Sequence, residues 1–179
     1  MKFEDHKKRG DRIEKRERML EQLLADRLKL FELVDQHLLP CGDNLVLLTL
    51  KGHLIIENLL DINLCRLLAI DSLPTEDELE FSQKLRLLQA VVVKREPGPN
   101  ADLFCAIRML NKTRNELAHN LRNLQETESA VRRIVQSYQS KSDAKLSSQH
   151  ALTDQLARCI RRLCRFLDDV GLQTFKLEW

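Results

Sequence analysis

Residues 44–70, with the sequence NLVLLTLKGHLIIENLLDINLCRLLAI, decide the fold of this 179-residue chain. Apolar side chains occupy nearly every register of the stretch, and the charges that interrupt it are Lys51, Glu57, Asp61 and Arg66. A helix that is apolar all round belongs in the middle of a bundle or against a second subunit. The interrupting charges keep the stretch short of a membrane span, so we expect a central helix and no membrane insertion.

Helical patterns continue on both sides of this stretch. Apolar residues recur at helical spacing from Met19 to Val34 and again from Leu152 to Val170. Turn-forming residues separate the segments at 40–42 (PCG), 71–74 (DSLP) and 96–100 (EPGPN). No strand pattern of useful length occurs. The sequence therefore predicts an all-α fold, an antiparallel bundle of five or six helices.

Capping residues predict where the helices begin and end. We expect Asp43 to cap the central helix, and Thr75 with Glu78 to form a capping box for a helix through about residue 93. Gly171 is expected as the C-cap of the last helix. Two further helices are predicted at about 101–124 and about 128–138.

Composition bounds the class of protein. The net charge of +2 excludes a polycation that coats nucleic acid, and five cysteines without a CxxC pair indicate buried thiols in a reducing compartment. The first twenty residues alternate charges and do not resemble a signal peptide, so the predicted location is cytoplasmic. We expect a charged N-terminal helical extension (1–40), a helical core (41–146) and a C-terminal helix packed on the same domain (147–179).

The predicted 101–124 helix carries residues suited to phosphate chemistry. On a helical wheel Arg114 falls in the middle of an apolar stripe, which would dehydrate its guanidinium. The stripe consists of Leu103, Ile107, Leu110, Leu117 and Leu121. One flank of it carries Arg108, Asn111, Asn115, His119 and Arg122. A guanidinium can bind a phosphate through two parallel hydrogen bonds, and an imidazole can transfer protons near neutral pH.

A structural role explains the same residues equally well. Arg114 could be one half of an ion pair, and Glu57 in the central helix is the expected partner. His53 and Glu57 are four residues apart on one face. A lone histidine on a helix is more often structural than catalytic. The four arginines of the last helix (Arg158, Arg161, Arg162 and Arg165) form either a solvated face, a dimer contact or a grip on RNA phosphates.

Residues 110–119, LNKTRNELAH, resemble the signature helix of the HEPN superfamily (higher eukaryotes and prokaryotes nucleotide-binding). The family mark is an arginine followed by a polar residue, with a histidine after four to six intervening residues. Arg114, Asn115 and His119 fit this pattern, with four residues between the arginine and the histidine. Residues 51–57 (KGHLIIE) and 81–85 (FSQKL) resemble the preceding helices of toxin-like members, so the likeness covers about 44–125.

The resemblance implies a metal-independent endoribonuclease that works as a homodimer, with two signature helices forming one composite cleft. It assigns catalysis to Arg114, His119 and Asn115. Glu57, Asn111 and His53 are expected to support them, and Arg108, Lys112 and Arg122 to contact RNA. No metal or cofactor is expected.

Many relatives act in toxin–antitoxin or antiviral defence, beside an antitoxin or nucleotidyltransferase partner. The alternatives are a catalytically inactive HEPN-like regulatory module and a helical adaptor that docks a partner through its charged N-terminal helix.

Overall fold

The structure is a computed structural model that describes residues 18, 21, 22, 25, 27–68, 70, 79–95, 101–119, 124–138 and 151–175. The chain divides into two compact units, Met1–Gln36 and His37–Trp179. In the first unit, residues 27–36 are helical. The described part of the chain contains helices and turns but no strand, which confirms the predicted all-α class.

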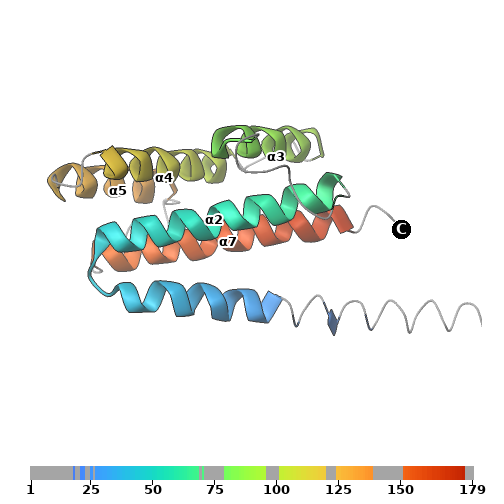
Figure 1. Ribbon diagram of the computed structural model, residues 1–179, viewed down its shortest axis with the longest axis horizontal. Coiled ribbons are helices and arrows are strands. Elements are labelled where there is room, and N and C mark those ends of the chain that lie inside the picture. The colour runs from blue at the N-terminus through green and yellow to red at the C-terminus, as the bar shows by residue number, and fades with distance from the viewer. Residues whose placement is uncertain are drawn as a thin grey trace, which may run out of the picture. The chain divides into compact units, whose positions relative to one another are not determined.

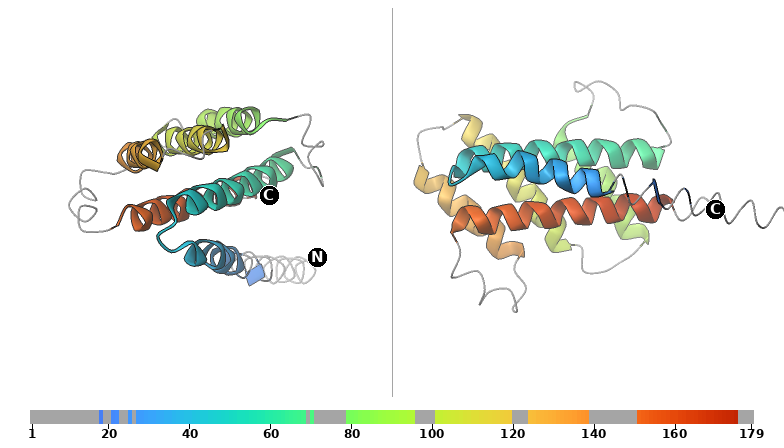
Figure 2. Two further views of the ribbon diagram at one scale, coloured as in Figure 1. Left: turned by 60° about the vertical axis from the view of Figure 1, so that its left-hand side comes forward. Right: turned by 90° about the horizontal axis from the view of Figure 1, so that it is seen from below.

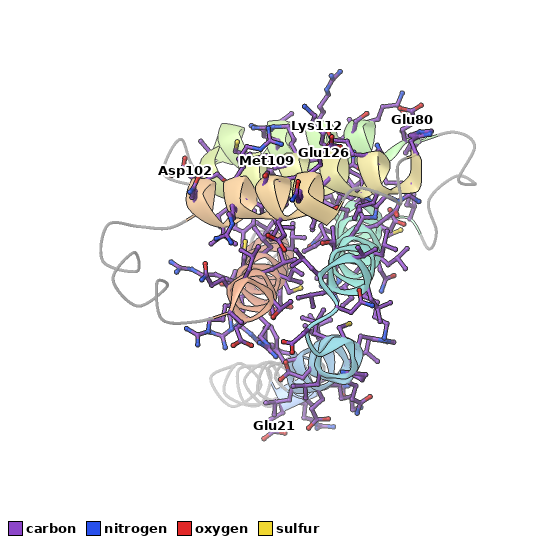
Figure 3. The ribbon with its side chains drawn as sticks, turned by 90° about the vertical axis from the view of Figure 1, so that its left-hand side faces the viewer. Glu21, Glu80, Asp102, Met109, Lys112 and Glu126 are labelled. Atoms are coloured by element: carbon purple, nitrogen blue, oxygen red, sulfur yellow. The ribbon has the colours of Figure 1, made fainter. Side chains whose placement is uncertain are left out.

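The second unit has two layers of helices. After a short 3-10 turn, η1 (Leu39–Cys41), it contains α2 (Leu45–Leu68), α3 (Phe81–Arg95), α4 (Ala101–His119), α5 (Leu124–Tyr138) and α7 (Leu152–Phe175). α2 and α7 lie side by side along their length and make the most extensive contact of any two helices (Figure 1). α3, α4 and α5 form the second layer and cross this pair (Figure 2). In Figure 3, α2 and α7 are seen nearly end-on while α4 and α5 run across the view.

The central pair runs in one direction, so the bundle is not antiparallel throughout. Gly52 of α2 lies against Ile160 of α7. Further along both helices, Asn63 Nδ2 donates to the backbone oxygen of Leu167 at 3.0 Å. Contacts that advance together along two helices require a parallel pair. The long connection through α3, α4 and α5 allows this direction, because α2 and α7 are far apart in the chain.

α2 is the central helix of the unit, as its apolar sequence predicted. It contacts α7 on one side and α3, α4 and α5 on another, which explains why so few of its registers are polar. Its buried apolar residues are Leu45, Leu48, Ile56, Leu59, Leu60 and Leu64. Among the described residues, no helix combines the length and hydropathy that a bilayer crossing needs.

Two glycines allow the close approach of α2 and α7. A Cβ at Gly52 would collide with Ile160 Cδ1, and one at Gly171 would collide with Asn63 Oδ1 and lie 3.0 Å from Arg66 Nη1. The prediction that Gly171 caps α7 is wrong, because the helix continues through it to Phe175. The glycine is required by packing against α2 and not by a left-handed backbone at the helix end.

The beginnings of the helices differ from prediction by a few residues. Asn44, and not the predicted Asp43, caps α2, since its Oδ1 accepts from the backbone N–H of Leu47 at 2.9 Å. α3 begins at Phe81, where the backbone N–H of Glu80 donates to Gln83 Oε1 at 2.8 Å. The predicted capping pair at 75 and 78 lies outside the described residues. α5 begins at Leu124, four residues before its predicted start at 128.

The buried stripe of α4 contains Ile107, Leu110 and Leu117, as predicted, but passes through Thr113 and not through Arg114. Thr113 is buried between the turns of Leu110 and Leu117, and its hydroxyl donates to the Met109 backbone oxygen at 2.9 Å. This local bond satisfies the hydroxyl, so threonine can occupy a core position. Arg114 is consequently half-buried at the edge of the stripe, and the prediction of a dehydrated guanidinium in its middle is wrong. The predicted stripe residue at 121 lies outside the described residues.

Candidate nucleic-acid site

His53 lies where α2, α3 and α4 meet. It is only 2% exposed. Its imidazole stacks on the Phe81 ring of α3, with 4.6 Å between centroids and 27° between planes. On the other side, His53 Nε2 lies 2.9 Å from Oδ1 of Asn111 on α4. One histidine therefore connects three helices.

Lys84 of α3 provides the cation that faces the carboxylates of α2. It is 5% exposed. Its Nζ lies 2.8 Å from Asp61 Oδ1 and 4.0 Å from Glu57 Oε1, and Glu57 Oε2 lies 3.7 Å from His53 Nδ1. The predicted ion pair between Glu57 and Arg114 is wrong, because α3 supplies its own cation to Glu57. A buried ammonium is stable only beside such carboxylates.

We call His53, Glu57, Asp61, Lys84 and Asn111 the interhelix cluster. Burial is the main cause that lowers the pKa of His53 below its ordinary value, because it penalises the charged imidazolium. The hydrogen bond with Asn111 and the charge of Glu57 act in the opposite direction. The positive charge of Arg114 adds to the lowering, so this arginine lies within electrostatic range of the cluster.

The three signature residues reach the protein surface on α4. Arg114 is half-buried, while Asn115 and His119 are exposed. Arg114 Nη1 donates to Asn115 Oδ1 at 3.1 Å on the exposed side of the helix. Within the described part of the chain, neither Arg114 nor His119 forms an ion pair with a carboxylate. The signature residues thus lie at the surface of α4 without a charged partner among the described residues.

The residues predicted to contact RNA lie near the signature residues but have partners of their own. Arg108 is exposed and its Nη1 donates to Gln89 Oε1 of α3 at 2.9 Å. Lys112 Nζ lies 3.8 Å from Glu116 Oε1, with the lysine side chain 70% exposed. Figure 3 shows Lys112 on the side of α4 turned away from α2 and α7. The third predicted contact, the arginine at 122, lies outside the described residues.

Sequence reasoning did not single out Lys84 or Phe81 as members of a polar cluster. A signal was present: Phe81, Leu85, Leu88 and Val92 form the buried stripe of α3, and Lys84 falls inside it. A cation in an apolar stripe needs a carboxylate from a neighbouring helix. Glu57 and Asp61, one turn apart on α2, are the complementary signal.

Other features of the described residues do not add to this site. The five cysteines are free thiols, and burial raises the pKa of Cys159 and Cys164 to about 12, so neither is a ready nucleophile. No group of three or more His, Cys, Asp or Glu side chains in the described ranges is placed to hold a metal ion. An open groove of about 560 Å³ lies between α4 and α5, where Glu116, Gln125 and Arg133 contribute to its lining.

The interhelix cluster joins α2, α3 and α4, and the exposed signature residues follow it along α4. Comparison of the chain with protein-family models, with curated proteins and with solved structures found no match.

Proposed function

We propose that this protein is a metal-independent endoribonuclease of the HEPN type, acting through Arg114 and His119 with Asn115 as their polar companion. The observation that carries the proposal is that, among the described residues, Arg114 forms no ion pair with a carboxylate. Glu57, its expected partner, instead faces Lys84 and His53. A cation that the fold holds near the surface without a carboxylate is suited to an anionic ligand such as a phosphate.

The chemistry of the three residues fits transesterification of RNA. The His119 imidazole takes the proton of a ribose 2′-hydroxyl, whose oxygen attacks the adjacent phosphorus. The bond from phosphorus to the 5′-oxygen breaks, that oxygen takes a proton from solvent, and His119 afterwards returns its own proton to solvent. The products are a 2′,3′-cyclic phosphate and a 5′-hydroxyl, with no change of oxidation state. The Arg114 guanidinium stabilises the charge that develops on the phosphate oxygens, and Asn115 orients it through their hydrogen bond.

Helix geometry favours a site shared by two copies. Residues five apart on an α-helix are separated by about 7.5 Å along the axis and by about 140° around it. Arg114 and His119 of one helix therefore point in rather different directions. Two α4 helices facing each other would bring the arginine of one copy toward the histidine of the other. A homodimer with a composite cleft is accordingly part of the proposal.

The expected substrate is single-stranded or loop RNA held mainly by its backbone. Arg108 and Lys112 are exposed on the same helix as Arg114 and offer further positive charge. The chain has only six Phe, one Tyr and one Trp, so stacking platforms that would select a base sequence are scarce. Selection by RNA shape and strand accessibility follows from this composition.

The test is cleavage of total RNA and of structured RNA in EDTA by the wild type, His119→Ala and Arg114→Ala. We expect each substitution to lower the cleavage rate by roughly 10²–10⁴-fold, the usual effect of losing a general acid–base or charge-stabilising group. Products of the wild type should carry a 2′,3′-cyclic phosphate. Unchanged cleavage by either variant would refute the assignment of that residue.

Matched controls separate loss of chemistry from loss of charge. His37 and Arg132 are exposed residues of the same types on other elements. His37→Ala and Arg132→Ala should cleave at the wild-type rate, and circular dichroism should be the same for all five proteins. Sedimentation should show a dimer for the wild type. In cells, growth arrest on expression that His119→Ala relieves would support a toxin or antiviral defence role and would justify a search for an antitoxin.

A catalytically inactive, HEPN-like interaction module is the second candidate. It is favoured by the position of the groove between α4 and α5, whose described lining includes neither Arg114 nor His119. Absence of cleavage by a dimeric, folded wild type would move the assignment to this candidate.

A further inference from the structure

The interhelix cluster contains a buried histidine that cleavage chemistry does not use. We propose that His53 is a positioning residue for Arg114: as a neutral imidazole that donates from Nε2 to Asn111 it fixes α4, and its protonation displaces Arg114. The inference rests on the proposed function only for its effect on RNA cleavage. The coupling between His53 and Arg114 can be measured without any RNA.

The contacts of the ring determine which nitrogen carries the proton. Asn111 presents its Oδ1 to His53 Nε2 at 2.9 Å, and an amide oxygen can only accept. Nε2 is therefore the protonated nitrogen of the neutral ring. The stack on Phe81 holds the plane of the imidazole, so the hydrogen bond fixes the rotation of α4 relative to α2 and α3.

The second nitrogen is poised to take a proton. His53 Nδ1 is buried and has no hydrogen-bond partner among the described residues, and Glu57 Oε2 lies 3.7 Å from it. A proton on Nδ1 would draw this carboxylate toward the ring. Glu57 is held only weakly by Lys84, at 4.0 Å, because that lysine sits closest to Asp61. The cluster can therefore rearrange locally when His53 becomes charged.

Charge balance explains why Arg114 would respond. The charged groups that act on the ring are Glu57 from α2, whose Oε2 lies 3.7 Å from Nδ1, and Arg114 from α4. Lys84 of α3 pairs with Asp61 of α2. One carboxylate and one cation thus act on the ring, and their charges balance only when His53 is neutral. Among the described residues of α5 and α7, no charged side chain acts on the ring.

Interaction between two charges is reciprocal. Arg114 follows Asn111, the hydrogen-bond partner of the ring, by three residues and so lies on the adjacent turn of α4. Because Arg114 disfavours the imidazolium, the imidazolium disfavours Arg114 in its place. Among the described residues, the hydrogen bond of Arg114 goes to Asn115 on its own helix, so no hydrogen bond to another described helix opposes this repulsion. Acidification should move the guanidinium away from His53.

The first test is NMR spectroscopy of the whole chain labelled with ¹⁵N, titrated from about pH 8 to about pH 5, the range in which histidines respond. We expect the Nε2–H tautomer of His53 at the upper end, and an Arg114 Nε signal that shifts together with the His53 transition. His53→Gln keeps a donor in the place of Nε2 but cannot titrate, so its Arg114 signal should stay constant. An Nδ1–H tautomer, or an Arg114 signal that ignores the His53 transition, would overturn the proposal.

A second variant protects this test if His53→Gln fails to fold. Asn111→Asp replaces the amide with a carboxylate that favours the charged imidazole. The Arg114 transition should therefore occur at higher pH than in the wild type, and an unchanged transition would contradict the coupling. His37→Gln removes an exposed histidine and should leave the Arg114 titration as it is.

Cleavage assays then distinguish the two proposals. Below the His53 transition, kcat/KM of the wild type should fall by about tenfold per pH unit. This decrease should come in addition to any pH dependence that His53→Gln also shows. Identical pH profiles of the two proteins would refute the effect of His53 on activity. If no RNA is cut but the Arg114 signal follows His53, the ribonuclease assignment fails and the positioning role stands.

Discussion

The interhelix cluster and the exposed end of α4 use the same residue types in opposite ways. Each contains a histidine, an asparagine and a cation. In the cluster, His53, Asn111 and Lys84 are bonded to residues of other helices. At the end of α4, Arg114 donates to Asn115 within the same helix, and His119 is exposed. The first set joins helices, whereas the second set joins no two of the described helices.

This difference teaches that residue type alone does not separate a structural from a functional role. The two roles differ in whether a polar atom has its hydrogen-bond or ion-pair partner within the fold, since a buried polar group without a partner lowers stability. Substitutions should therefore change stability in the cluster and activity at the end of α4. The following predictions concern stability and run from the largest expected effect to the smallest.

Lys84→Met should have the largest effect on stability. It removes the cation that lies 2.8 Å from Asp61 and leaves two neighbouring carboxylates on α2 facing an apolar side chain. Because these carboxylates are about one-third exposed, we expect a loss of about 2–3 kcal/mol in the free energy of unfolding, less than for a fully buried pair. Urea denaturation measures it.

A second substitution checks the cause of that loss. Adding Asp61→Asn to Lys84→Met removes one of the stranded charges, so part of the lost stability should return. If the double variant is as unstable as the sum of the two single variants, the lysine acts by packing and not by charge.

Asn111→Ala and Asn115→Ala compare one residue type on adjacent turns of α4. Asn111→Ala leaves His53 Nε2 without its partner and should cost about 1–2 kcal/mol of unfolding free energy. Asn115→Ala, at an exposed position, should change stability by less than about 0.5 kcal/mol. Chemical denaturation of both proteins tests the contrast, and equal losses would contradict the division between the two regions.

The stability of the wild type should decrease as the pH falls below the ordinary histidine range. The pKa of His53 is lowered in the folded protein, so the unfolded chain binds more protons between the unfolded and the folded pKa. The stabilisation is fully present above the unfolded value of about 6.5 and is lost as the pH falls toward the folded value. Urea midpoints at several pH values should show a smaller decrease for His53→Gln. The same decrease in both proteins would exclude His53 as the cause.

Lys112→Met should have the smallest effect. Lys112 forms an ion pair with Glu116 at 3.8 Å, but both side chains are well exposed to solvent. Pairs of this kind on a helix contribute less than about 0.5 kcal/mol. Thermal unfolding at low and moderate salt measures the difference. A loss comparable to that of Lys84→Met would mean that exposure does not separate the two lysines as proposed.

Much of the fold could be predicted, because apolar periodicity depends on local sequence. The all-helical class and the central position of α2 were confirmed, and the turn at 40–42 precedes α2 as predicted. The predicted breaks at 71–74 and 96–100 lie outside the described residues. The start of α2 was wrong by one residue, since Asp43 and Asn44 are both good caps and only geometry selects one. The role of Gly171 was wrong because glycine serves both helix ends and close packing, and only the contact with Asn63 distinguishes them.

For the candidate site, the sequence predicted which residues belong together on α4 but did not predict their contacts with other helices. That Arg114, Asn115 and His119 share a helix follows from spacing, whereas only the structure showed that Arg114 is half-buried and that Asn115 and His119 are exposed. The pairing of Glu57 could not be predicted, since Arg114 and Lys84 were both possible cations and lie on different helices. Pairing between helices depends on the rotation and crossing of each helix, which the sequence of one segment does not determine.

By itself, the sequence determined that the chain forms helices, that residues 45–68 are central, and that α4 carries an arginine, an asparagine and a histidine at fixed spacing. These properties depend on backbone periodicity and on burial of apolar surface, which act within a segment. Only the tertiary structure decided that α2 and α7 run parallel, that Lys84 faces Glu57 and Asp61, and that His53 joins three helices. Those outcomes depend on how side chains from distant segments fit together and satisfy one another's charges and hydrogen bonds.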